Sequence, residues 1–296
     1  MYKLVISILF LVGFNLCPSQ IVKEYRAVVV NDSGHPIEFC AVSYVNRNVG
    51  VYTDSNGIFL LSNAQSINDS LMFSFIGFKR MVISANNIKN NKVLDTIVLQ
   101  QNSFSIDTLT ILPEQFNIEV FNNKKNEHNS FTGSQGTLLV YHLTSNKIGY
   151  LKNVEFYLNN YTGKKGEIAL RILEFKQIAI NNNNSLTSNE NIVLTVSKGR
   201  TKVRVDLTKY NILVPKEGIL VGLEFLSNSS SKKSNSKKWY KGKIYAQTTL
   251  KAENSTYVSR WGRKWSNYTK ASKNADGTSN NLKVSYSLLI PENEKK

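Results

Sequence analysis

The chain has 296 residues, with 37 Lys and Arg against 21 Asp and Glu, so its formal net charge is +16. This length accommodates two domains of ordinary size, and two cysteines exclude a disulfide-rich scaffold. Short runs of β-branched and aromatic residues alternate with turns rich in Asn, Gly and Ser, while helical periodicity is nearly absent. This pattern predicts an all-β protein built from sandwich or jelly-roll domains.

The N-terminus has the features of a secretory signal peptide. Lys3 precedes an apolar run over residues 4–14, and small and polar residues follow it. The run is shorter than the about 20 apolar residues that a membrane span needs. We expect cleavage after Ser19 and an exported protein that is periplasmic, on the cell surface or secreted. A lipid anchor at Cys17 is the alternative, although the bulky Leu16 before it argues against one.

Cleavage after Ser19 would leave Cys40 as the remaining cysteine, which excludes an internal disulfide. Cys40 lies within an apolar, strand-like run over residues 37–42. We therefore expect a buried core thiol here rather than a reactive one.

Charge and composition divide the chain near residue 101. The first part is nearly neutral, whereas most of the positive excess lies between residues 227 and 283. The predicted organisation is a signal peptide over 1–19, a β-sandwich over 20–101, a linker over 102–131, a second β-sandwich or jelly-roll over 132–290 and a polar tail over 291–296.

The first part predicts about seven short strands, separated by turns in which Asn, Asp and Gly supply the needed backbone conformations. The expected strands cover residues 25–30, 37–45, 49–53, 58–61, 71–76, 78–83 and 95–100.

Three ordered motifs in this part resemble the carboxypeptidase regulatory-like domain. The first is the run over residues 28–42; the second comprises Gly50, Thr53, Asp54, Gly57 and Phe59; the third comprises Asp69, Leu71, Ser74, Ile76, Gly77 and Phe78. The resemblance covers residues 22–101 and implies a transthyretin-like sandwich. Such domains occur on exported proteins and transporters of the Bacteroidetes, where they are accessory rather than catalytic.

The second part is expected to be β-structured as well, with strands over 138–143, 151–158, 167–175, 191–196, 201–207, 219–226, 243–247, 256–260 and 282–289. Residues 202–225 resemble a segment of exported Bacteroidetes proteins of unassigned function that carry the same first domain. A jelly-roll is expected by analogy with carbohydrate-binding modules, and fold alone does not determine function.

Catalytic chemistry finds little support. His35 and Glu38 have a spacing that zinc enzymes use, but they lie inside the first motif, and zinc needs three or four converging ligands. Glu155 and Glu167 remain open as a carboxylate pair, although two solvated strand faces explain them more simply. We therefore expect no catalytic residue, no metal, no cofactor and no enzyme.

One group of residues has the composition of a binding surface. All three tryptophans lie in the basic segment, together with tyrosines and many cations. The candidate ligand-binding residues are Trp239, Tyr240, Trp261 and Trp265 for stacking, and Lys237, Lys238, Arg260 and Arg263 for charge contacts. Aromatic faces beside cations suit sugar rings or anionic polymers. The alternative is that the aromatics belong to the core and the charges are solvated.

The expected function is that of a non-catalytic exported or envelope-associated module that binds a glycan or an anionic surface polymer through the second domain. The alternative is a structural protein that docks to an envelope protein, for example through an exposed sheet edge. A specific nucleic-acid partner is not expected, because no reader motif accompanies the basic charge.

Overall fold

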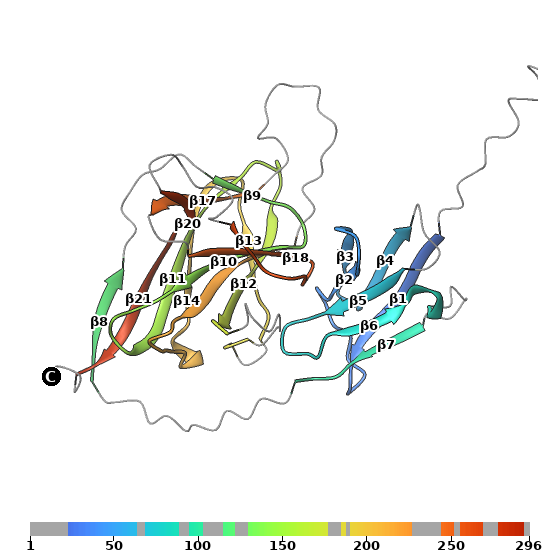
Figure 1. The fold of residues 1–296 in the computed structure, drawn as a ribbon, viewed down its shortest axis with the longest axis horizontal. Helices are drawn as coiled ribbons and strands as arrows, with labels where there is room; N and C mark the ends of the chain where they lie inside the picture. Colours follow the sequence, from blue (N-terminus) through green and yellow to red (C-terminus); the bar gives the residue numbers. More distant parts are fainter. Residues whose placement is uncertain are drawn as a thin grey trace, which may run out of the picture.

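The computed structural model describes residues 23–63, 69–88, 95–102, 115–121, 130–176, 185–187, 190–226, 244–251, 255–268 and 278–292. The predicted signal peptide, its expected cleavage site and Cys17 lie outside these residues. The described parts form β-sheets with two short 3-10 turns, η1 (Ala85–Asn87) and η2 (Thr208–Tyr210), so the all-β prediction is confirmed (Figure 1). None of the helices in these parts is long and apolar enough to cross a bilayer.

The first domain consists of two small sheets. One has the order β4-β1-β7 and the other the order β3-β2-β5-β6. The strands are β1 (Lys23–Asn31), β2 (Ala41–Tyr44), β3 (Gly50–Tyr52), β4 (Ile58–Asn63), β5 (Ser70–Ser74), β6 (Met81–Ser84) and β7 (Asp95–Leu99). All seven strands predicted for this part are present.

The predicted turns of the first domain form as their polar residues indicate. The Asn31 side-chain oxygen accepts hydrogen bonds from the amides of Ser33 and His35, at 3.0 and 2.8 Å. Asp54 does the same for the amides of Asn56 and Ile58, both at 2.9 Å. These side chains replace backbone partners in the turns, which is the reason Asn and Asp favour them.

The core of the first domain lies between its two sheets and contains Cys40, which is fully buried. Burial raises the pKa of the Cys40 thiol to about 12. The thiol is therefore neutral at physiological pH, and the prediction of a structural core cysteine is confirmed.

The second domain is a larger β-sandwich. Its first sheet has the order β13-β12-β16-β10-β18-β19, formed by β10 (Thr137–Leu143), β12 (Gly166–Glu174), β13 (Ile192–Val196), β16 (Ile219–Phe225), β18 (Thr256–Arg260) and β19 (Ser266–Asn267). Its second sheet is built on β8 (Phe116–Phe121), β9 (Ser130–Gly133), β11 (Gly149–Asn160), β14 (Gly199–Asp206), β15 (Leu213–Val214), β17 (Ile244–Lys251), β20 (Ser279–Leu282) and β21 (Val284–Pro291).

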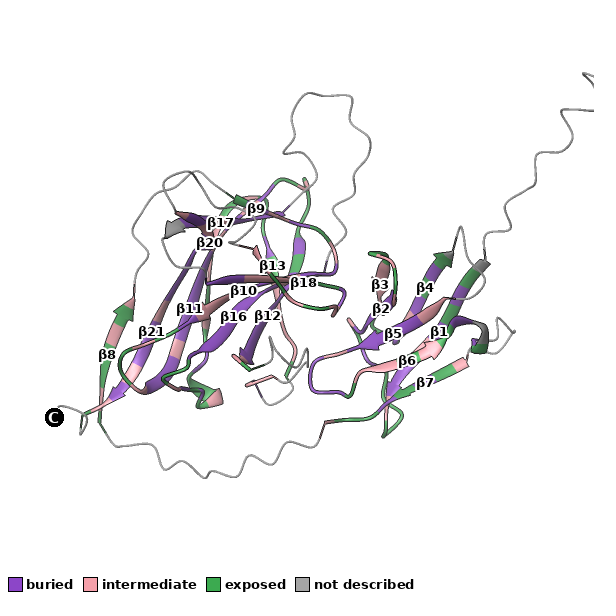
Figure 2. Ribbon diagram, viewed as in Figure 1, coloured by how far each residue is buried: buried purple, intermediate pink, exposed green. Residues whose placement is uncertain are grey.

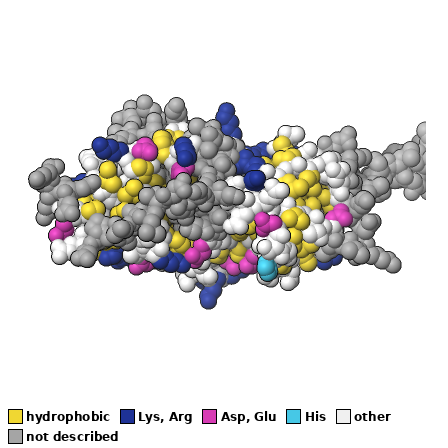
Figure 3. All heavy atoms as spheres, turned by 90° about the horizontal axis from the view of Figure 1, so that it is seen from below, with side chains coloured by type: hydrophobic (Ala, Val, Ile, Leu, Met, Phe, Trp, Pro, Cys, Tyr) yellow, Lys and Arg dark blue, Asp and Glu magenta, His cyan; other side chains and the backbone are white. Residues whose placement is uncertain are grey.

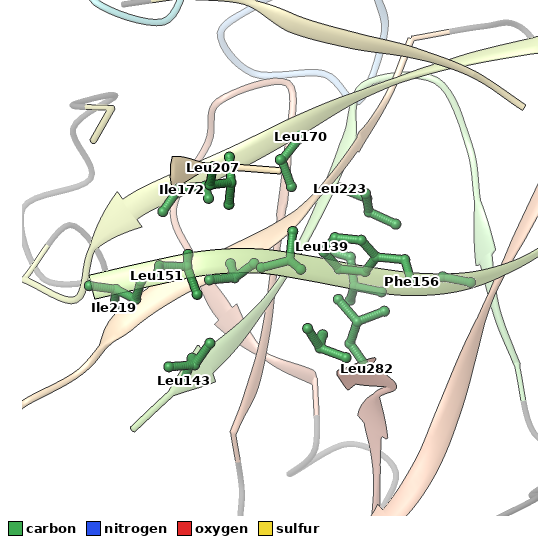
Figure 4. Close-up of a cluster of buried hydrophobic side chains, with 14 of the residues drawn as sticks. Leu139, Leu143, Leu151, Phe156, Leu170, Ile172, Leu207, Ile219, Leu223 and Leu282 are labelled. Carbon is green, nitrogen blue, oxygen red and sulfur yellow. The ribbon is translucent and has the colours of Figure 1, made fainter. Parts of the chain in front are cut away.

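Alternate residues of both sheets face one shared core in the second domain. Leu139 and Leu170 come from the first sheet, and Leu151 and Phe156 come from the second (Figure 4). Each of these four side chains is at most 1 % exposed. The strand period of two residues places their neighbours on the outer faces of the sandwich. Figure 2 shows that buried residues run along both sheets.

The linker predicted for residues 102–131 is wrong at two places. Residues Phe116–Phe121 form β8, which pairs with β21 in antiparallel register, with Phe121 opposite Tyr286. The two rings stack with centroids 4.6 Å apart. Residues 130 and 131 belong to β9, which pairs with β17. The Asn- and Lys-rich composition around β8 concealed a strand whose partner lies far along the chain.

The two domains contact each other along the outer face of the six-stranded sheet. Val140, Leu173 and Leu220 of that face form an apolar cluster with Ile76 from the turn between β5 and β6. The Tyr52 hydroxyl donates to a Glu224 carboxylate oxygen at 2.7 Å, and Arg171 Nε donates to the other oxygen at 2.7 Å. The Arg171 side chain is 5 % exposed. The interface thus combines an apolar contact with a buried, paired charge network.

Candidate functional site

The predicted aromatic and basic residues fall into two groups in the structure. Lys237, Lys238, Trp239 and Tyr240 lie outside the described residues, so their assignment stays a prediction. Arg260, Trp261, Arg263 and Trp265 are described, and they occupy the end of β18 and the turn into β19.

This turn projects from the second domain to the first. Trp261 and Gly262 both have left-handed backbone conformations, with φ of 52° and 67°. The Arg263 amide donates to the Arg260 carbonyl at 3.1 Å, as in a type I′ turn. The Ser259 hydroxyl donates to the Arg263 carbonyl at 2.7 Å, which holds the far side of the turn. The turn therefore presents its side chains in a defined direction.

Trp261 is wedged between the domains and is 6 % exposed. Its ring lies 5.2 Å from that of Tyr52 in the first domain. A Cβ atom at Gly136 would lie 2.1 Å from Trp261 Cε2, and one at Gly50 would lie 2.8 Å from the same indole. The Trp261 amide also donates to the Gly136 carbonyl at 2.6 Å. The indole faces are occupied by protein, which for Trp261 favours the core alternative over ligand stacking.

Arg263 joins the same two domains through its guanidinium group. One terminal nitrogen donates to the Tyr44 carbonyl at 2.9 Å and the other donates to the Asn48 side-chain oxygen at 3.1 Å. Burial lowers the pKa of Arg263 from its ordinary value, yet an arginine retains its charge at physiological pH. Arg263 is therefore a structural contact that also places a positive charge at the domain boundary.

A hollow of about 300 Å³ opens beside this contact. We name it the basic pocket, and it is lined by Asn48, Val258, Arg260, Arg263, Lys264 and Ser266. Arg260 and Lys264 are exposed, and none of the lining residues carries a carboxylate. Figure 3 shows Lys and Arg side chains gathered where the two domains meet.

The chemistry of the basic pocket suits an anionic group. Guanidinium groups donate bidentate hydrogen bonds to carboxylates, sulfates and phosphates, and an ammonium adds a mobile point charge. Trp265 lies between the pocket residues Lys264 and Ser266 in the sequence and is half-buried. Its side chain packs against the apolar interface cluster. Of the two described tryptophans, Trp265 is the one that keeps partial solvent exposure.

Two further titratable groups, the Glu155 carboxylate and the His142 imidazole, have structural partners. Glu155 forms ion pairs with Lys202 at 2.6 Å and with Arg204 at 3.6 Å. His142 stacks on Phe175 at 3.7 Å, and burial lowers the pKa of its imidazole. Over the described ranges, no group of three or more His, Cys, Asp and Glu side chains is arranged to hold a metal ion.

Sequence reasoning missed the first-domain contribution to this region. The β18–β19 turn contacts three first-domain residues, Tyr44 and Asn48 through Arg263 and Tyr52 through Trp261. No local pattern in the sequence connects these residues to the turn. Arg171 and Glu224 did carry a signal, since each is a charge inside an apolar strand run. Such a residue in a strand predicts a buried ion pair or an interface.

Comparison with known proteins identifies the first domain. Residues 27–111 match the family model described as the CarboxypepD_reg-like domain. A search of curated proteins gives no match to the chain. The matched range contains the motifs over residues 28–42 and 69–78 and, apart from the first four residues of β1, both small sheets. It also includes the first-domain residues that contact the β18–β19 turn. The N-terminal region of this chain is therefore a CarboxypepD_reg-like domain, docked onto the outer face of a second β-sandwich.

Proposed function

We propose that this protein is a non-catalytic, exported module of the cell envelope that binds anionic groups of an envelope glycan or polymer at the basic pocket. The observation that carries the proposal is the convergence of Arg260, Arg263 and Lys264 on one hollow at the domain boundary. Arg260 carries a planar donor group that matches carboxylate and phosphate oxygens, and Arg263 adds positive charge beside it. The overall charge of +16 adds attraction at long range.

The division of roles within the turn follows from its contacts. Trp261 and Arg263 hold the domains together, whereas Arg260 and Lys264 extend to solvent. The exposed pair is thus available for a ligand without breaking the interface. Trp265 supplies the partly exposed aromatic face, and Trp239 and Tyr240 remain predicted stacking residues.

A binding screen on the mature chain from residue 20 tests this proposal. Uronic-acid glycans, lipopolysaccharide, teichoic-acid-type phosphate polymers and neutral glycans would be compared at low and moderate salt. We expect saturable binding to an anionic polymer that weakens about tenfold in an Arg260→Gln/Lys264→Gln variant, a loss of about 1.4 kcal/mol.

The matched control removes two charges elsewhere. Lys147→Gln/Lys209→Gln has the same net charge as the test variant, and both lysines lie in exposed ion pairs away from the pocket. Equal loss in the test and control variants would show that binding depends on net charge alone and would contradict a defined pocket. Binding to no polymer would contradict the proposed function.

The exposed strand β8 favours a second candidate, docking to an envelope protein. Within the described part of the chain, β8 pairs with β21 alone, and Ile118 and Val120 on it are 55 % and 59 % exposed. Such a strand can accept a further strand from a partner. In an Ile118→Lys/Val120→Lys variant, we expect loss of protein partners in a crosslinking experiment with unchanged polymer binding. Unchanged crosslinking would contradict this candidate.

A further inference from the structure

A second hollow lies on the domain boundary and has the opposite chemistry to the basic pocket. It has a volume of about 650 Å³, within the range of ligand-binding pockets, and such pockets are frequent at domain interfaces. We name it the acidic groove. Its lining comprises Asn31, Pro36, Ile37, Glu38, Phe39, Phe75 and Phe78 from the first domain, and Glu167, Asn191 and Val193 from the second. It shares no lining residue with the basic pocket.

The lining of the acidic groove is negatively charged, whereas the chain as a whole is positively charged. Two carboxylates, Glu38 and Glu167, line it from the two domains, and no Lys or Arg belongs to its lining. Both side chains are exposed to solvent. In a chain with 37 basic residues against 21 acidic ones, a groove with this lining contrasts with the overall positive charge. Figure 3 shows acidic side chains at this boundary next to hydrophobic side chains.

Aromatic rings form the apolar part of the groove. Phe75 and Phe78 lie 5.6 Å apart in a tilted pair on the turn after β5. Phe39 has a φ of 60°, an uncommon conformation for a bulky residue. Its amide donates to the Thr53 carbonyl at 3.0 Å, and the Thr53 hydroxyl donates to the Ile37 carbonyl at 2.5 Å. The ring of Phe39 is thus presented at the groove by a loop that Thr53 holds in place.

Asn191 adds a directed polar group on the second-domain wall. Its side-chain oxygen accepts a hydrogen bond from Arg171 at 2.8 Å, which orients the amide. The amide nitrogen remains a donor that suits a peptide carbonyl. Through Arg171, this side chain is coupled to the buried network of Glu224 and Tyr52.

We propose that the acidic groove binds an extended peptide segment that carries lysine or arginine side chains. Carboxylates form charge-assisted hydrogen bonds with ammonium and guanidinium groups, and aromatic faces attract the same cations. The methylene groups of a lysine stem pack on the rings while its charged end reaches a carboxylate. A groove with carboxylates on both walls and the half-buried rings of Phe39 and Phe75 offers these contacts together.

A titration of the full mature chain with capped tetralysine, capped tetraalanine and spermine tests this proposal. The positive charge of the protein repels cationic probes elsewhere, so saturable tetralysine binding reports a defined site. We expect tetralysine to bind, tetraalanine not to bind, and a Glu38→Gln/Glu167→Gln variant to bind tetralysine about tenfold or more weakly. Glu119→Gln is the control, because it removes one negative charge from β8, where Glu119 pairs with Lys147 away from the groove.

Tetralysine affinity that is unchanged in the double variant, or equally reduced by Glu119→Gln, would overturn the assignment of the groove. Spermine binding as tight as tetralysine binding would overturn the peptide part of the proposal. Unfolding temperatures measured in parallel verify that the variants keep the domain interface. Polymer binding at the basic pocket is expected to be unchanged in the double variant, so this test is independent of the proposed function.

Discussion

Replacement of Trp261 by alanine is expected to uncouple the two domains. The indole is 6 % exposed and is enclosed by Tyr52 and Gly50 of the first domain and by Gly136 of the second. A side chain of this kind buries about 150–250 Å², which at about 25 cal/mol per Å² corresponds to about 4–6 kcal/mol. This figure is an upper bound, since unfolded chains already bury some surface, and core Trp→Ala changes cost about 3–5 kcal/mol.

Differential scanning calorimetry measures this loss directly. A loss of 1 kcal/mol in the free energy of unfolding lowers the thermal unfolding midpoint by roughly 2–4 °C in a domain of this size. For the Trp261→Ala variant we therefore expect this midpoint to fall by about 6–20 °C. Because the lost contact joins the domains, the transition of the variant should separate into two. Tyr161→Ala is the aromatic control, since Tyr161 is 41 % exposed, and it should cost less than about 1 kcal/mol. A Trp261→Ala variant that unfolds at the wild-type temperature in one transition would refute the role of Trp261 at the interface.

Three further predictions concern the interface and the core. Gly136→Ala should strongly lower the free energy of unfolding measured by chemical denaturation, because the φ of Gly136 is 77° and the new Cβ would lie 2.1 Å from the Trp261 indole. The control Gly163→Ala, at a residue with a φ of 82° and open space around it, should cost only about 1 kcal/mol. Glu224→Gln should cost about 3–5 kcal/mol, since it leaves the buried Arg171 without its counter-charge; a double-mutant cycle with Arg171→Met should show a coupling, and additive effects would contradict the pair. Burial raises the pKa of Cys40 from 9.0 to about 12, so the folded state keeps a proton that the unfolded state loses between these pH values. The free energy of unfolding should therefore fall as pH rises from 9 to 12, and the thiol should resist alkylation at neutral pH. Rapid alkylation of the native protein, detected by mass spectrometry, would contradict this prediction.

Strand positions were well predicted wherever local pattern decides them. The seven strands of the first domain follow from apolar runs between Asn, Asp and Gly turns, whose side-chain hydrogen bonds are present in the structure. Strand β8 was missed because Asn117 and Glu119 alternate with its apolar residues within a polar region. Its stabilising partner β21 is remote in sequence, and no local pattern reports such pairing.

The candidate site was predictable in composition but not in the role of each residue. A tryptophan among cations has the same sequence pattern whether it stacks on a sugar or fills a domain interface. The burial of Trp261 depends on Gly50 and Gly136, which are both remote from it in sequence. Gly50 belongs to the first domain and Gly136 to the second. Arg260 and Arg263 both line the basic pocket, and Arg263 also makes the interface contact, whereas ligand binding by either arginine stays a prediction.

We propose that an anionic ligand binds at the basic pocket between the domains. Hydrogen–deuterium exchange of the full mature chain, measured with and without the anionic polymer that binds best, tests where the ligand lies. With ligand bound, we expect slower exchange at residues 258–266 and 44–49, which flank the pocket from the two domains. Protection confined to other basic surfaces, such as strand β14 with Lys202 and Arg204, or spread evenly over the chain, would contradict it.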